Sequence, residues 1–278
     1  MIASLARASA RIRLPMLYLG FAALAVGAAL SVAGVGPAWA WVFGIGTASA
    51  VIGTALQFLG PAVPGEPLVL ASPVRGRWEA VNSPASRVPS HGTHGYGQSY
   101  AVDLVALTDE GATMAERVAP TSAFSPPETF ASFGRPVLAP AEGIVVRATD
   151  RQRDHGSRAR ALGLAAFFAE AMLRELGGPS RVLGNHVVLR LDDGSHFVLA
   201  HLRHGSLRVA AGDVVSRGAH LADVGNTGNS TEPHLHCHRQ DAAATVIAAG
   251  LPWTIEGDGI PENGGVLDAG AAPGADRG

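Results

Sequence analysis

Three short segments of this 278-residue chain contain imidazole or carboxylate side chains in settings that suit metal binding. His234 and His236 stand two residues apart, Asp103 ends a Tyr-Ala-Val-Asp segment, and His201 lies between them in the sequence. Zinc in proteins is bound by histidine nitrogen and carboxylate oxygen, and a catalytic site keeps one coordination position open. These residue types therefore predict a mononuclear zinc site with a spare imidazole for proton transfer.

Strand geometry explains why the spacing of the paired histidines matters. Side chains two residues apart share one face of a β-strand, so His234 and His236 project together and Leu235 points to the core. Both imidazoles then bind one metal, or one binds while the other handles protons. Asp103, on a neighbouring strand, supplies an oxygen ligand.

A further histidine upstream of Asp103 is expected to complete the ligand set. His91 lies 12 residues before Asp103 and His94 lies nine before it, so either reaches the metal only if the intervening loop folds back. We expect His91, which opens a Ser-His-Gly-Thr turn, with His94 as the alternative. His201 is the natural second imidazole, because an unperturbed histidine pKa of about 6.5 suits proton transfer near neutral pH.

The other histidines and the lone cysteine have simpler interpretations. Strand alternation puts His238 on the His236 face, where we expect a surface role rather than a contact with the site. Cys237 faces with Leu235 and is expected to be a small core residue. Roles in turns, on strand surfaces or in ordinary hydrogen bonds are expected for His155, His186, His196, His204 and His220.

Composition narrows the function classes. A formal net charge of −2, from 21 basic and 23 acidic residues, does not indicate a nucleic-acid partner. The 35 glycines and 18 prolines favour short strands and tight turns over a helical bundle. With Cys237 as the single cysteine, no internal disulfide is possible.

The N-terminal part predicts a membrane anchor. Residues 14–65 contain no charged side chain, and a spanning helix needs about 20 apolar residues, so this run accommodates two spans. We expect helices near 15–33 and 38–59, broken at 34–37 by glycine and proline. A signal peptide is too short to explain the second apolar stretch, and a buried soluble hairpin would need a larger surrounding core.

The predicted domain organisation follows from these segments. It comprises a basic N-terminus (1–14), a two-helix transmembrane hairpin (15–60), a proline-rich linker (61–76), a mainly β domain (77–256) and a disordered tail (257–278). Alternating apolar patterns predict strands at 77–81, 99–107, 143–148, 185–191, 196–202, 206–209, 213–215 and 220–224, followed by the His-Leu-His strand. Helical spacing over 159–176 predicts a helical insertion within 156–178.

Several motifs, in this order and spacing, resemble a known family. They are His91, Tyr-Ala-Val-Asp at 100–103, and the segments 136–145, 184–188, 199–202, 212–218 and 225–236. The combination is similar to the lysostaphin-type (LytM-like) zinc endopeptidases that cut peptidoglycan peptides, and it covers about residues 78–240. The resemblance implies the duplicated hybrid motif fold, an antiparallel β-sandwich or barrel-like domain with a groove.

The resemblance also implies roles for individual residues. An upstream histidine, Asp103 and His236 would be the zinc ligands. His201 and His234 would be catalytic, one activating water and one stabilising the oxyanion. Two departures from the family pattern are the long spacing between His91 and Asp103 and the Cys-His pair at 237–238, where an aromatic or aliphatic residue is common.

Three function classes are compatible with these residues. The first is a membrane-anchored zinc metalloendopeptidase that acts on peptidoglycan cross-links or stem peptides. The second is a non-catalytic LytM-like module that binds cell wall or activates another hydrolase; such modules lack ligand residues, whereas all positions are filled here. The third is a phosphoryl carrier, which leaves Asp103 and the upstream histidine unexplained. Arginines flanking the two spans favour cytoplasmic ends, whereas a wall substrate requires an extracytoplasmic domain.

Overall fold

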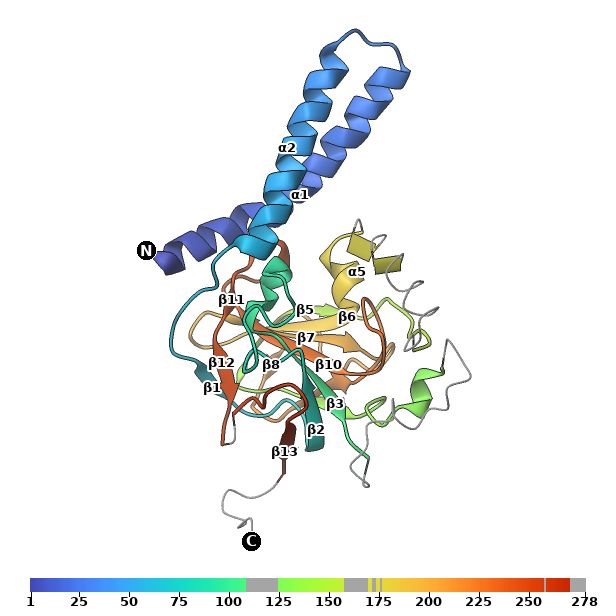
Figure 1. The fold of residues 1–278 in the computed structure, drawn as a ribbon. Coiled ribbons are helices and arrows are strands. Elements are labelled where there is room, and N and C mark those ends of the chain that lie inside the picture. Colours follow the sequence, from blue (N-terminus) through green and yellow to red (C-terminus); the bar gives the residue numbers. More distant parts are fainter. Residues whose placement is uncertain (109–124, 158–169, 172–173, 176, 258, 271–278) are drawn as a thin grey trace.

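The structure combines a long helical hairpin with a β-sheet domain (Figure 1). It is a computed structural model, and the residues it describes are 1–108, 125–157, 170–171, 174–175, 177–257 and 259–270. The prediction of a mainly β fold preceded by two apolar helices is confirmed. Both helices are long and apolar enough to cross a membrane, as judged by length and composition.

Helix α1 (Ile2–Val32) and helix α2 (Ala38–Leu59) form the hairpin. The bounds of α2 match the predicted second span, but α1 begins well before the predicted first span and includes the basic N-terminal segment. Pro15 lies inside α1, and the helix bends between its N-terminal part and the hairpin (Figure 1). Proline lacks the N–H that would bond four residues back, which accounts for a bend at this position.

Glycines bring the two helices into close contact. A Cβ atom added at Gly53 would lie 2.6 Å from the backbone nitrogen of Leu17, and one added at Gly20 would lie 2.6 Å from that of Ala50. Such distances are shorter than any ordinary carbon contact. The hairpin therefore depends on small residues at its interface, as expected for packing between apolar helices.

Strand β10 is near the centre of the largest sheet, and its neighbours are β3 and β7. In spatial order the sheet contains β13 (Val266–Ala269), β2 (Gly76–Val81), β3 (Val102–Ala106), β10 (Leu235–Gln240), β7 (His196–Leu202), β6 (Asn185–Arg190), β5 (Gly143–Thr149) and β8 (Val214–Val215), with β11 (Gly250–Leu251) also paired to β10. All of these pairs are antiparallel.

Two small sheets pack on the same core. They are the antiparallel pair β4 (Pro136–Leu138) with β9 (His220–Asp223) and the parallel pair β1 (Leu68–Leu70) with β12 (Trp253–Ile255). Leu70, Val137, Leu221 and Trp253 from these pairs belong to the hydrophobic cluster that includes Leu235 of the large sheet. Strands β13 and β8 are the two edges of the large sheet and do not pair with each other, so the described strands form no closed barrel.

Short helical turns complete the described elements. They are α5 (Pro179–Leu183) and the 3₁₀ turns η1 (Gly95–Tyr100), η2 (Pro127–Thr129) and η3 (Thr245–Ile247). Most of the predicted helical insertion at 156–178 lies outside the described residues; those described at 170–171 and 174–175 are helical.

Three segments differ from the sequence prediction. The predicted linker (61–76) contributes strand β1 to the domain, and residues 206–209 form an irregular connection instead of a strand. In the predicted disordered tail (257–278), residues 266–269 form β13. Leu267 of this strand is buried opposite Trp78, and this apolar contact compensates for a glycine-rich sequence context.

The helix contact at Gly53 can be tested by a single methyl group. We expect Gly53→Ala to destabilise the hairpin by about 1–3 kcal/mol, because the added carbon meets the Leu17 backbone. The measurement is thermal unfolding of the full-length protein in detergent micelles, followed by circular dichroism.

The matched control is Gly44→Ala in the same helix. A Cβ atom at Gly44 meets nothing within 4 Å, and alanine is a better helix former than glycine, so this variant should unfold at the same temperature as the parent or higher. Equal unfolding temperatures for the two variants would contradict the assigned helix contact.

Candidate metal centre

The register of three neighbouring strands brings the predicted site residues together. His236 of β10 lies directly opposite Asp103 of β3 on one side and Ala200 of β7 on the other. Residues directly opposite on antiparallel strands project to the same face. His201 follows Ala200, so the sheet places a carboxylate and two imidazoles at one end of three adjacent strands.

The Asp103 carboxylate is the centre of the cluster. His236 Nδ1 lies 2.9 Å from Oδ1, and His91 Nε2 lies 3.0 Å from Oδ2. His234 Nε2 is 3.5 Å from Oδ1, and Asn82 Nδ2 donates a hydrogen bond of 2.9 Å to Oδ2. Ligand atoms of His91, Asp103 and His236 all lie within 4.8 Å of one another, so these three residues can hold one metal ion.

The loop that carries His91 folds back as the long spacing requires. The Ser90 backbone nitrogen donates to Ser99 O at 3.1 Å, which closes the loop. Within η1, Tyr96 and Gly97 adopt positive φ angles of 54° and 73°, and these turn the chain toward β3. His94 instead bonds through Nδ1 to Ser99 Oγ at 2.9 Å and is not part of the His91–Asp103–His236 cluster.

His201 reaches the site through an irregular backbone. Strict alternation would turn its side chain away from His236, because Ala200 opposes His236. A positive φ of 62° at His201 breaks the alternation, and its ring centroid lies 5.6 Å from that of His236. Nδ1 donates to Thr227 O at 2.8 Å, which leaves Nε2 bare in the neutral ring.

His234 has the same arrangement of its ring nitrogens. Nδ1 donates to Glu232 O at 2.8 Å, and the ring centroid lies 4.8 Å from that of His201. Its Nε2 points at the Asp103 carboxylate. Two imidazoles thus present their Nε2 atoms beside the His91–Asp103–His236 cluster, each oriented by a backbone carbonyl.

Burial and charge set the protonation states. Burial alone would raise the pKa of Asp103, but the positive charges of His91 and His234 hold this pKa well below its usual range. Burial lowers the pKa of His201 strongly and that of His236 as well. For His234 burial acts the same way, yet attraction to Asp103 outweighs it and raises the pKa.

A chain of hydrogen bonds from His236 through His238 to Gln240 determines which ring nitrogen of His236 is free to bind a cation. Gln240 Nε2 donates to Ala242 O at 2.8 Å, so its Oε1 faces His238 Nε2 at 3.2 Å and must accept. Burial lowers the pKa of His238 far below its ordinary value, so the ring is neutral and its Nδ1 is bare. His238 Nδ1 therefore accepts from His236 Nε2, which is 3.1 Å away.

The consequence is a bare nitrogen aimed at a carboxylate. With its proton on Nε2, neutral His236 presents the lone pair of Nδ1 to Asp103 Oδ1 at 2.9 Å. Two acceptors at this distance repel each other unless a proton or a metal cation lies between them. The donor set therefore fits a divalent cation, and nitrogen with carboxylate oxygen is a set that zinc accepts.

These groups line a cleft of about 720 Å³. It contains all five predicted site residues, His91, Asp103, His201, His234 and His236. It also includes residues that the sequence analysis did not select, among them Gln57 and Phe58 from the end of α2 and Tyr96 from η1. No sequence pattern links α2 to the site, because that contact depends on tertiary packing.

Three of the remaining histidines follow the expectations, and His238 does not. His155, His186 and His220 make ordinary hydrogen bonds outside the cleft, and Cys237 is buried in the core as expected. His238 is fully buried rather than on the surface. The signal was available in the sequence, because His236, His238 and Gln240 share one strand face and are all polar.

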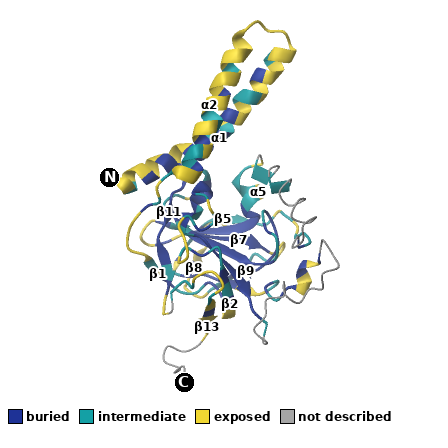
Figure 2. Ribbon diagram, in the orientation of Figure 1, coloured by how far each residue is buried: buried dark blue, intermediate teal, exposed yellow. Residues whose placement is uncertain are grey.

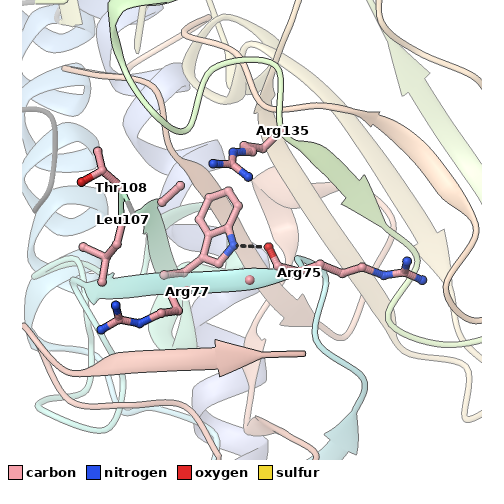
Figure 3. Close-up of a pocket in the computed structure, with 8 residues that line it drawn as sticks. Arg75, Arg77, Leu107, Thr108 and Arg135 are labelled. Atoms are coloured by element: carbon pink, nitrogen blue, oxygen red, sulfur yellow. Dashed lines mark hydrogen bonds between the residues drawn. The ribbon is translucent and has the colours of Figure 1, made fainter. Parts of the chain in front are cut away.

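A second hollow contains no metal-ligating side chain. It measures about 270 Å³ and is lined by residues of β2 and its surroundings, including Arg75, Arg77, Trp78 and Arg135. Trp78 donates its indole N–H to Arg75 O, and Figure 3 shows the Arg75 side chain extending away from Arg77 and Arg135.

Comparison with known families agrees with the motifs. Residues 169–246 match the model of Peptidase family M23. The matched segment contains His201, His234 and His236, whereas His91 and Asp103 precede it. The resemblance to lysostaphin-type peptidases is confirmed by this match.

Individual relatives are distant. An uncharacterized metalloprotease of Haemophilus influenzae is 30% identical over 128 residues, which are 45% of this chain and only 21% of the relative's length. The catalytic domain of lysostaphin from Staphylococcus simulans is 21% identical, with 54% of this chain and 74% of that chain covered and a TM-score of 0.31. A peptidase M23 structure from Pseudomonas aeruginosa is 20% identical, with 68% of this chain and 56% of that chain covered and a TM-score of 0.33.

Removing the hydrogen-bond partner of His236 should weaken metal binding. We expect His238→Leu to lower zinc affinity by about 10- to 100-fold, since groups that orient a ligand histidine typically contribute that much. The measurement is zinc competition against a chromophoric chelator at neutral pH, with circular dichroism as a check of folding.

A second buried histidine serves as the control. His186 is also almost inaccessible and bonds through Nδ1 to Gly184 O at 2.7 Å, but it lies outside the cleft. His186→Leu should leave zinc affinity unchanged. Unchanged zinc affinity in folded His238→Leu would show that His238 does not orient a ligand.

Proposed function

We propose that this chain is a membrane-anchored zinc metalloendopeptidase that hydrolyses peptide bonds, with peptidoglycan cross-links or stem peptides as the substrate. The observation that carries the proposal is the buried Asp103 carboxylate, which lies within hydrogen-bonding distance of ring nitrogens of His91 and His236 beside two further oriented imidazoles. The match to Peptidase family M23 over residues 169–246 supports the same reaction class.

In this proposal His91, Asp103 and His236 hold the zinc ion. Their ligand atoms lie close enough to share one ion, and the hydrogen-bond chain behind His236 leaves its Nδ1 bare. Zinc, when bound there, supplies Lewis acidity toward a carbonyl oxygen and a water molecule.

His201 and His234 perform the proton chemistry. Each is oriented by a bond from Nδ1–H to a backbone carbonyl, so that Nε2 faces the cleft. One imidazole takes a proton from the attacking water at a bare Nε2, and the other, protonated on both ring nitrogens, donates from Nε2 to the charge that develops on the carbonyl oxygen. This division requires two imidazoles within reach of one peptide bond, and their ring centroids are 4.8 Å apart.

The membrane anchor in this proposal is the α1–α2 hairpin. Residues 15–60 lie within the 52-residue stretch that has no charged side chain, and both helices have the length and composition of membrane spans. We place the domain on the extracytoplasmic side, where peptidoglycan is found. Arg11 and Arg13 of the flanking segment have partners in the domain, so docking accounts for these charges without a cytoplasmic location.

The alternatives explain fewer features. A non-catalytic module needs no complete ligand set, yet His91, Asp103 and His236 are all present and converge. A phosphoryl carrier needs an imidazole accessible to a partner protein, whereas His201 and His234 are only 5% and 8% exposed. Neither alternative requires a carboxylate surrounded by three imidazoles.

Two substitutions separate metal binding from catalysis. We expect His236→Ala to lose both bound zinc and the ability to digest isolated cell walls, because a ligand is removed. His201→Ala should retain zinc and lose digestion, because it removes a proton-transfer group outside the ligand set. The measurements are metal content of the purified full-length protein by mass spectrometry and release of soluble wall fragments.

The parent protein treated with a chelator is the control, and added zinc should restore its digestion. Stoichiometric zinc in His236→Ala would disprove the ligand assignment. Full digestion by His201→Ala would disprove the catalytic assignment. A zinc-loaded parent protein that leaves walls intact would favour the non-catalytic module.

A further inference from the structure

The end of the helical hairpin forms part of the wall of the cleft. Gln57 and Phe58, in the last turn of α2, line it together with His91 and Asp103. The Gln57 carbonyl accepts a hydrogen bond of 2.8 Å from the His94 backbone nitrogen. The loop that carries His91 is thus attached directly to the end of an apolar helix.

Helix α1 contacts the cleft through a second set of bonds. Tyr18 OH donates to the Tyr96 hydroxyl oxygen at 2.7 Å, and Tyr96 OH donates to Glu175 Oε1 at 2.6 Å. Tyr96 and Glu175 both line the cleft, whereas Tyr18 lies inside the stretch without charged residues. Next to this contact, a hollow of about 480 Å³ lies between Phe21 of α1 and the Gly177–Gly178 turn.

The dimensions of the hairpin place this contact at the lipid boundary. The 22 residues of α2 span about 33 Å at 1.5 Å each, close to the thickness of about 30 Å of a bilayer's hydrocarbon core. Trp39 and Trp41 lie at one end of α2, and Phe58 and Leu59 lie exposed at the other. A bilayer centred on the hairpin therefore has its surface at the helix end that lines the cleft.

The N-terminal part of α1 presents an apolar face beside this boundary. Ala6 and Ala10 dock against the domain at Val63, Ala249 and Leu251. Residues on other sides of the same segment are exposed and apolar, namely Met1, Ile2, Leu5 and Ile12. Figure 2 shows this segment as a mostly exposed helix next to the base of the hairpin. It is continuous with the first span, so the occupant of its apolar face is the bilayer surface.

The connection between hairpin and domain does not act as a flexible tether. Val63 is buried, and its carbonyl accepts a hydrogen bond of 2.7 Å from Tyr100 OH. Arg11 forms an ion pair of 3.0 Å with Asp241, and Arg13 donates to Ala248 O at 2.8 Å. The domain is therefore held in one position against the helices.

We propose, on the basis of the function proposed above, that the cleft lies at the membrane surface and that its substrate is a peptide tethered to the bilayer by an anchor of its own. A peptide in the outer layers of a cell wall would not reach a cleft held at this level. A peptide carried by a lipid or by a transmembrane helix is presented at the same height as the zinc ligands.

The position of the cleft can be measured without any activity. Thr231→Cys places a single accessible thiol in the cleft, because the natural Cys237 is fully buried. The full-length protein, labelled there with a small fluorophore, is reconstituted into vesicles whose lipids carry a nitroxide on the headgroup. We expect strong quenching of this label.

The matched control is Asp268→Cys on β13, an exposed position at the end of the domain away from the helices (Figure 1). Its label should be quenched weakly, since the sheet domain separates it from the hairpin. Equally weak quenching at both positions would overturn the membrane-surface location, whether or not the protein is a peptidase.

The substrate is tested with peptides released from isolated cell walls. The same peptides are supplied free, coupled to a diacyl lipid, or joined to a transmembrane helix, each with the enzyme in the same vesicles. We expect a rate about tenfold or more higher for at least one anchored form, because anchoring raises the effective concentration at the cleft. The two anchored arms identify which anchor is used.

Faster cleavage of free peptides than of both anchored forms would overturn the substrate assignment while leaving the peptidase activity intact. If no form is cleaved by the zinc-loaded enzyme, the substrate assignment fails together with the proposed function. Quenching at Thr231→Cys would then still locate the cleft. His201→Ala supplies the background rate in every arm.

Discussion

The geometry of the site depends on one buried carboxylate shared by several imidazoles. An ionised carboxylate removed from water is costly unless it is paired and hydrogen-bonded. Asp103 is 7% exposed, and its two oxygens lie near His91, His234 and His236 and accept from Asn82. These contacts come from the loop before β3, the end of β2 and the start of β10, so the carboxylate connects segments that are distant in the sequence.

The same constraint explains why the helices matter to the site. His91 is held at Asp103 by a loop rather than by a strand, and a loop needs external support to keep one geometry. The bond between the Gln57 carbonyl and the backbone of His94 provides it from α2, and Tyr18 supports Tyr96 from α1. The hairpin is therefore part of the framework of the cleft, in addition to being the segment with the composition of a membrane anchor.

Regular patterns explain most of what the sequence predicted. Apolar residues in alternating sequence patterns located β2, β3, β5, β6, β7 and β10. Of these strands, β3, β6, β7 and β10 are buried on both faces. The stretch without charges located α2 to the residue. Strand β13 was not predictable, since its short glycine-flanked sequence gains stability only from pairing with β2. Contacts of Gln57 and Tyr18 with the cleft depend on tertiary packing that no local pattern records.

At the site itself, the sequence predicted which residues take part but not the backbone conformations that position them. Three residues other than glycine have clearly positive φ angles among those described, namely Asn82, Tyr96 and His201. Each such conformation costs about 1–3 kcal/mol and persists only when surrounding contacts impose it. Asn82 bonds Asp103, Tyr96 lines the cleft and His201 faces His234.

The concentration of strained residues in one place has a physical meaning. Nothing in the alternation of β7 or in the composition of η1 signals a left-handed residue, so sequence patterns would place the His201 ring on the wrong face. The fold accepts this cost because the strained backbone aims side chains at a common point. A site assembled by the protein in this way is preorganised, so a bound cation need not draw distant ligands together and the two oriented imidazoles keep their positions beside it.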